Sequence, residues 1–168
     1  MHVLYLLSVW LHILAATAWI GGMFFLVLVV VPWLRHNPGT DAGAFLRDTG
    51  LRFRSVGWVC FAVLLVTGSF NLWTRGVRFG SFLDADFRQS PFGHSVLVKL
   101  SLFTAVLVVS AIHDFGVGPR ATEAIAADPR SVESQRLRRQ ASWLGRINAL
   151  LALALVAVAV TLVRGVPW

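Results

Sequence analysis

Ionisable side chains interrupt three of the four long apolar runs in this 168-residue chain. His12 lies in the first run, Lys99 and His113 lie in the third, and Arg146 lies in the fourth. A charged side chain in hydrocarbon costs roughly 2.5–3.5 kcal/mol on insertion scales, and such residues usually serve a function. The sequence therefore predicts a membrane protein with polar chemistry between its helices.

The two histidines within these runs are the first candidates for a metal or cofactor site. A neutral imidazole is the commonest metal ligand in proteins, so His12 is the leading candidate ligand for haem iron or copper. A core histidine that hydrogen-bonds to a neighbouring helix is the competing interpretation of His12. His113 is the second candidate, although a structural role near the end of its run fits it equally well.

A depth estimate groups some of these residues at one side of the membrane. With a rise of 1.5 Å per residue, His12, Lys99 and Asn71 fall roughly 7–9 Å outward of the midplane, and Thr67 lies near them. Lys99 could instead extend to the outer interface, as long cationic side chains do.

The largest group of candidate imidazole ligands for copper is expected at the outer side of the membrane. His2 and His94 are expected at the outer surface, above His12, where each of them alone would be a solvated side chain. The chain has only two methionines and one cysteine, Cys60, which limits the soft ligands available to Cu(I). Cys60 is expected to be a buried small hydrophobe.

A second group falls on the inner side. His113 and Arg146 come out roughly 12 Å inward, with Asp114 and Asn148 within about one turn. We expect Arg146 to pair with Asp114 or with a haem propionate, and the alternative is that it extends to the interface. His12 and His113 differ by roughly 19 Å in depth, so they cannot be the two axial ligands of one haem.

The elements that must position these residues are four transmembrane helices, expected over residues 3–31, 56–73, 95–115 and 143–162. The hydrophobic fraction of 57% and the charged fraction of 14% support this class. We predict an all-α fold, a transmembrane up-down four-helix bundle in one integral membrane domain, residues 1–168. The first run is too long for a signal peptide and has no basic region before it, so we expect it to be retained.

Breaks between the helices are expected at Pro32, at residues 37–39 and at Gly116–Pro119. The polar segment 121–140 is expected to extend the fourth helix, and no internal repeat is evident.

The charge distribution predicts the topology. The net charge is +7, and most of the arginines lie in the first and third loops, which are therefore expected to be cytoplasmic, with both termini outside. We expect a bacterial-type inner (plasma) membrane and no nucleic-acid partner. The arginines of these two loops are Arg35, Arg47, Arg52, Arg54, Arg120, Arg130, Arg136, Arg138 and Arg139.

Three segments resemble known membrane proteins. LHILAATAWIGGMFFLVLVVVP, GWVCFAVLLVTGSFNLW and VKLSLFTAVLVVSAIHDFGVGPR resemble the CopD domain, the membrane part of copper resistance protein D. The spacing of His12, Trp19 and Gly21 and the Val-Lys-Leu opening of the third helix carry most of this resemblance. The same elements are similar to the HemJ-type protoporphyrinogen oxidases, which pair a helix-one His with a Lys and a later His and are associated with haem b.

The first functional prediction is a b-type haem protein with an electron-transfer or oxidoreductase role, whose partner would be a quinone or a redox protein. Its first candidate axial ligand is His12 and its second is His113, and Lys99, Arg75 and Arg146 would pair with the propionates. Whether the chain is an enzyme stays open. The alternative is a copper-handling membrane protein that uses the outer imidazoles of His2, His12 and His94. A third class is an assembly partner without a cofactor.

Overall fold

The computed structural model describes residues 1–37, 42–128 and 130–164, and every regular element in this part of the chain is helical. The expected break at residues 37–39 falls mostly outside the described residues. In chain order the elements are α1 (His2–Phe25), the π-helix η1 (Leu26–Val30), α2 (Val31–His36), α3 (Ala42–Thr74), the 3₁₀-helix η2 (Phe79–Phe82), α4 (Ala85–Gln89), α5 (Pro91–Ala111), the π-helix η3 (Ile112–Val117), α6 (Gly118–Ala127) and α7 (Val132–Arg164).

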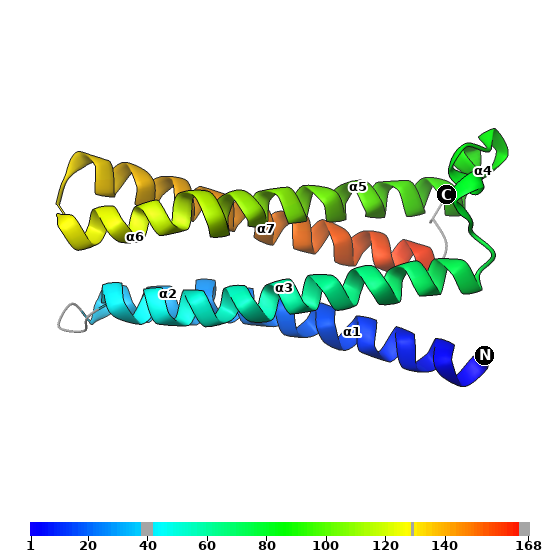
Figure 1. Cartoon of the computed structure of the whole chain (residues 1–168), viewed down its shortest axis with the longest axis horizontal. Coiled ribbons are helices and arrows are strands. Elements are labelled where there is room, and N and C mark those ends of the chain that lie inside the picture. The colour runs from blue at the N-terminus through cyan, green and yellow to red at the C-terminus, as the bar shows by residue number, and fades with distance from the viewer. Residues whose placement is uncertain (38–41, 129, 165–168) are drawn as a thin grey trace.

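These elements form two long hairpins that lie along one another (Figure 1). The continuous rod α1–η1–α2 packs against α3, and the rod α5–η3–α6 packs against α7. Four helical segments are long and apolar enough to cross a membrane: His2–Leu34, Arg47–Thr74, Pro91–Ala127 and Val132–Val163. The predicted all-α four-helix bundle is therefore confirmed.

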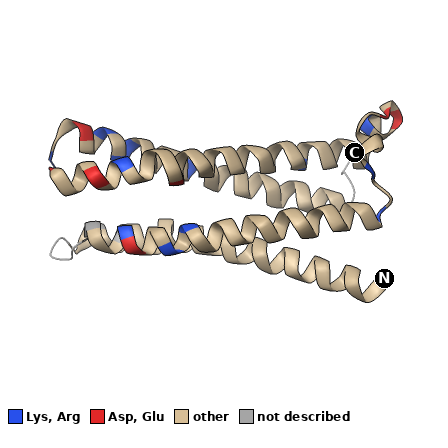
Figure 2. Ribbon diagram, viewed as in Figure 1, with Lys and Arg blue, Asp and Glu red and all other residues tan. Residues whose placement is uncertain are grey.

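The outer faces of the bundle are apolar, as lipid requires. Leu6, Val66 and Leu150 are 52%, 69% and 67% exposed, although they lie within apolar helices. Charged residues gather instead towards the two ends, most densely at the end that holds the α2–α3 and α6–α7 connections (Figure 2). A bilayer around the middle of the bundle would cover the exposed apolar side chains and leave most charges in water.

Two of the expected breaks are wrong. Pro32 and Pro119 each stand in the first turn of a short helix, α2 or α6, that continues the preceding rod. A π-helix precedes each of them, at Leu26–Val30 and at Ile112–Val117. Local π adjustments re-satisfy the backbone groups that a proline leaves free, so a membrane helix can run through it. Residues 121–127 therefore extend the rod α5–η3–α6 and not the fourth helix, which begins only at Val132 as α7.

The two hairpins repeat one plan. Ser8 and Ser95 are both buried at matching places in the first helix of each hairpin, 87 positions apart. His12 and Lys99 are separated by the same 87 positions, and so are Pro32 and Pro119. Most of the residues between these positions differ in type, so the repetition is not evident from the sequence. It places an ionisable side chain at the equivalent position of each hairpin.

One core joins the hairpins. Trp19 of α1, Phe61 of α3, Val106 of α5 and Ala152 of α7 are all buried in the same cluster. Phe61 meets Trp19 edge-on, with ring centroids 5.0 Å apart, and it reaches Phe103 of the second hairpin at 6.2 Å. The polar residues described below lie above and below this apolar layer.

Replacing Gly93 by alanine is expected to lower the free energy of unfolding by roughly 1–2 kcal/mol, because a Cβ there would overlap the backbone carbonyl of Phe87. That carbonyl belongs to α4, and Ser90, between α4 and α5, caps the start of α5 by accepting a hydrogen bond from the Gly93 N–H. Gly80 is the matched control, since its Cβ would meet nothing within 4 Å. Chemical unfolding in detergent should therefore separate the two variants, and equal stability would contradict the tight packing at Gly93.

Candidate functional site

His12 of α1 is turned towards α3 and is held by Thr67. Its Nδ1 lies 2.7 Å from Thr67 Oγ1, and Thr67 Oγ1 in turn donates to the Val63 carbonyl at 2.6 Å. A hydroxyl has one hydrogen, so the Thr67 oxygen accepts from the His12 Nδ1–H. This assigns the tautomer: the Nε2 of His12 keeps its lone pair. An imidazole oriented in this way is suited to bind a metal through Nε2.

The helices come close together at this point because small residues face each other. A Cβ on Gly68 would lie 3.3 Å from the Cε1 atom of His12, so the imidazole rests directly against the α3 backbone. Ser8, one turn before His12, donates its hydroxyl to the Thr67 carbonyl at 3.3 Å. The position of the ring is therefore fixed by Ser8, Thr67 and Gly68 together.

One cation lies near His12, and a second lies near that cation. The half-buried Lys99 of α5 is close enough to His12 to interact with it electrostatically, and Arg75, just beyond α3, acts on Lys99 in the same way. The Arg75 guanidinium donates to the Tyr5 hydroxyl at 3.4 Å and lies 5.9 Å from the Phe92 ring centre. Neither cation has an ion pair with any acidic side chain that the structure describes, so no direct carboxylate contact offsets the positive charge of Lys99 or Arg75.

The depth estimate for the outer residues largely agrees with the structure, which brings His12, Thr67 and Lys99 together. Asn71 lies one turn from Thr67 on α3, and its buried Oδ1 has no hydrogen-bond partner among the described residues. The role of these residues as ligands stays a prediction.

The structure does not assemble the three outer imidazoles into one site. His2 and His94 are exposed, and within the described ranges no three His, Cys, Asp or Glu residues come together as a metal site would require. A closed copper site made of His2, His12 and His94 is therefore not present.

His113 belongs to a second polar cluster, which includes two residues that the sequence did not suggest. His113 Nδ1 lies 2.9 Å from Asp114 Oδ1, and Asp114 Oδ2 accepts a hydrogen bond from Trp58 Nε1 at 3.0 Å. Arg54 donates to the Asp114 carbonyl at 3.1 Å, and its guanidinium lies 5.5 Å from the Phe115 ring centre. This cluster joins α3 of the first hairpin to η3 of the second. From the sequence, Arg54 was expected only as one of the loop arginines, and Trp58 was not a candidate site residue.

The expected pairing of Arg146 with Asp114 is wrong. Arg146 is exposed, and its guanidinium lies 5.4 Å from the ring centre of Trp143, one turn earlier on α7. Asn148, two residues further along α7, faces α5, since its Nδ2 donates to Ser110 Oγ at 3.0 Å. Its Oδ1 is buried and has no partner in the described part of the chain.

The two histidine sites are separate. Thr67, which holds His12, and Trp58, which holds the partner of His113, are nine positions apart on α3. That spacing corresponds to roughly 13 Å along the helix axis. One haem cannot use both histidines, as the sequence estimate also concluded.

Comparisons with known proteins agree with the membrane fold. The family model described as copper resistance protein D matches residues 47–162, which run from α3 into α7. An uncharacterized protein of Aquifex aeolicus (strain VF5) is 33% identical over 160 residues, and the match covers 95% of each chain. No solved structure matches.

Proposed function

Because the chain belongs to the CopD family, that of copper resistance protein D, we propose that it handles copper in the membrane, with His12 as the first protein ligand of the metal. The observation that carries this proposal within the molecule is the hydrogen bond of His12 Nδ1 to Thr67, which leaves Nε2 free. Imidazole nitrogen is a good ligand for copper. The family match gives copper more support than it gives haem.

The charge around His12 favours transit of copper over storage. A copper ion on His12 would be repelled by the Lys99 ammonium and, at longer range, by Arg75. A site on a conduction path must bind strongly enough to admit the ion and weakly enough to release it. An imidazole beside a cation meets both conditions.

A sulfur side chain between the two polar clusters supports a path through the bundle. Cys60 of α3 is buried in the shared apolar core, and it lies between Trp58 and Thr67 on that helix. A thiol group is a soft ligand that suits Cu(I). The proposed order is His12 at one end, Cys60 in the core, and His113 at the other end.

Metal analysis and an absorption spectrum of the purified protein test the proposal. We expect copper to bind to protein in a neutral detergent, and we expect protein from haem-replete cells to show no Soret band. A Soret band that His12→Ala abolishes, in protein that does not bind copper, would overturn copper handling in favour of the haem alternative.

The orientation of the bundle is part of the same proposal. We infer that the α2–α3 and α6–α7 connections are cytoplasmic, because the arginines concentrate there. Reporter fusions at Arg47 and at Arg130 are expected to report the cytosol, whereas fusions at Arg78 should report the opposite side. A non-cytosolic signal at Arg47 or Arg130 would reverse the orientation and make His12 the cytoplasmic end of the path.

A further inference from the structure

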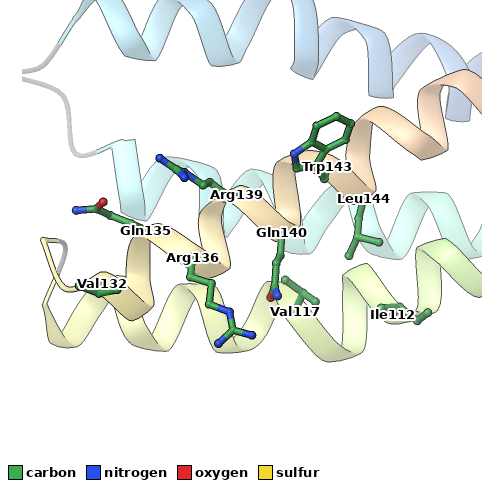
Figure 3. A pocket seen from close by; sticks show the side chains of 9 residues that line it. All are labelled: Ile112, Val117, Val132, Gln135, Arg136, Arg139, Gln140, Trp143 and Leu144. Carbon is green, nitrogen blue, oxygen red and sulfur yellow. The ribbon is translucent and has the colours of Figure 1, made fainter.

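A groove of about 600 Å³ lies at the end of the bundle that holds the α6–α7 connection (Figure 3). One wall comes from η3, with Ile112 and Val117, and the other comes from the N-terminal half of α7. Neither copper nor either histidine cluster has a role there, so the groove is independent of the proposed function.

The polar part of the groove is cationic. Arg136 and Arg139 line it, both are exposed, and neither has an ion pair or hydrogen bond within the described residues. Figure 3 shows their side chains leaving α7 in different directions. No acidic residue lines it. Guanidinium groups bind phosphate oxygens in a bidentate manner, which gives the groove a preference for a phosphate-bearing ligand.

The other part of the groove is apolar and lies further from the α6–α7 connection. Trp143 and Leu144 follow the two arginines on α7, in the direction of the apolar middle of the helix. Ile112 and Trp143 are 49% and 61% exposed, so an apolar ligand has surface to cover. Tryptophan is enriched where the headgroups meet the hydrocarbon. Cationic groups above apolar ones match the order of a phospholipid, with its phosphate at the arginines and an acyl chain against Ile112 and Leu144.

We propose that this groove is a binding site for one anionic phospholipid of the adjacent leaflet. A basic groove beside a transmembrane helix is suited to select lipids by headgroup charge. A zwitterionic lipid would add a positive group next to Arg136 and Arg139 and would bind less well. Inorganic phosphate lacks the acyl chains that cover the apolar part.

Native mass spectrometry of the full chain in a neutral maltoside detergent tests the proposal. The protein is titrated with dioctanoyl phosphatidylglycerol, with dioctanoyl phosphatidylcholine, and with inorganic phosphate as a competitor. We expect a first phosphatidylglycerol to bind at least fivefold more tightly than phosphatidylcholine, and millimolar inorganic phosphate to displace little of it. Arg139→Gln should weaken that binding at least fivefold, and the Arg136→Gln/Arg139→Gln pair at least tenfold.

Arg138→Gln is the matched control, because Arg138 is an exposed arginine of the same helix that lines neither this groove nor its neighbour. It should change the affinity less than twofold. Arg136 also lines the neighbouring groove, with Glu123 and Glu133, so Arg139→Gln is the cleaner single variant. Equal losses in Arg138→Gln and Arg139→Gln would show a diffuse charge effect and overturn the site. Equal affinity for the two lipids, or full displacement by inorganic phosphate, would overturn it as well.

Discussion

Replacing His12 by alanine is expected to weaken copper binding by about a hundredfold or more, because the change removes the nitrogen that we propose binds the metal directly. Thr67→Val should cost about tenfold, since it keeps the imidazole but removes the hydroxyl that fixes its tautomer and orientation. Competition against a chromophoric copper chelator, with the protein in detergent, measures both affinities.

His94→Ala is the matched control for His12→Ala. His94 is an exposed histidine near the start of α5, and among the described residues it belongs to no cluster of His, Cys, Asp or Glu that could hold a metal ion. Its loss should change the affinity less than twofold. Thermal unfolding of the His12→Ala protein should stay close to that of the parent, because Thr67 still donates to the Val63 carbonyl. Unchanged copper affinity in a folded His12→Ala protein, or an equal loss in His94→Ala, would contradict the assignment of His12.

The architecture was predictable because a bilayer restricts it so strongly. A spanning segment must satisfy its own backbone hydrogen bonds, so four long apolar runs predict four helices. The same restriction explains why the expected breaks at Pro32 and Gly116–Pro119 were wrong. In water, proline and glycine often end a helix, whereas here a π-helix precedes each proline and the rod continues.

The depth of a residue along its helix was predictable from the sequence, but the direction in which its side chain points around the helix axis was not. The 1.5 Å rise brought His12, Thr67 and Lys99 to one level, and the structure brings them together. The same arithmetic placed Arg146 beside Asn148, yet two residues along a helix differ by roughly 200° in direction. Asn148 faces Ser110 of α5, so Arg146 points away from α5. Only the packing of α7 could decide which of the two would face inwards.

The hydrogen-bond partners of Asp114 could not be predicted from the sequence for a related reason. Tryptophan is typical of the membrane interface, and Arg54 lies in a segment that is expected to be a cytoplasmic loop. Both interpretations consider only how far a residue lies from the bilayer centre. The contact itself depends on α3 passing beside η3, which no sequence pattern encodes.

Replacing Asp114 by alanine is expected to lower the free energy of unfolding by roughly 3 kcal/mol. The carboxylate accepts from Trp58 Nε1 and from His113 Nδ1, and a hydrogen bond to a charged group contributes about 1.5–3 kcal/mol. The loss also strands the Trp58 N–H at the contact between the hairpins. Denaturant titration in mixed micelles, followed by circular dichroism, measures the change.

Two further variants show whether Asp114 acts through Trp58. Trp58→Phe keeps the ring contact with Phe115 but removes the N–H donor, so its effect and that of Asp114→Ala should overlap by about 1 kcal/mol in the double variant. Arg146→Leu should change stability by no more than about 0.5 kcal/mol, because Arg146 is exposed and has no ion pair with any acidic residue that the structure describes, while its guanidinium lies against Trp143 of its own helix. If Arg146→Leu destabilises the protein as much as Asp114→Ala does, or if the effects of Trp58→Phe and Asp114→Ala add fully, then Asp114 does not join the hairpins through Trp58.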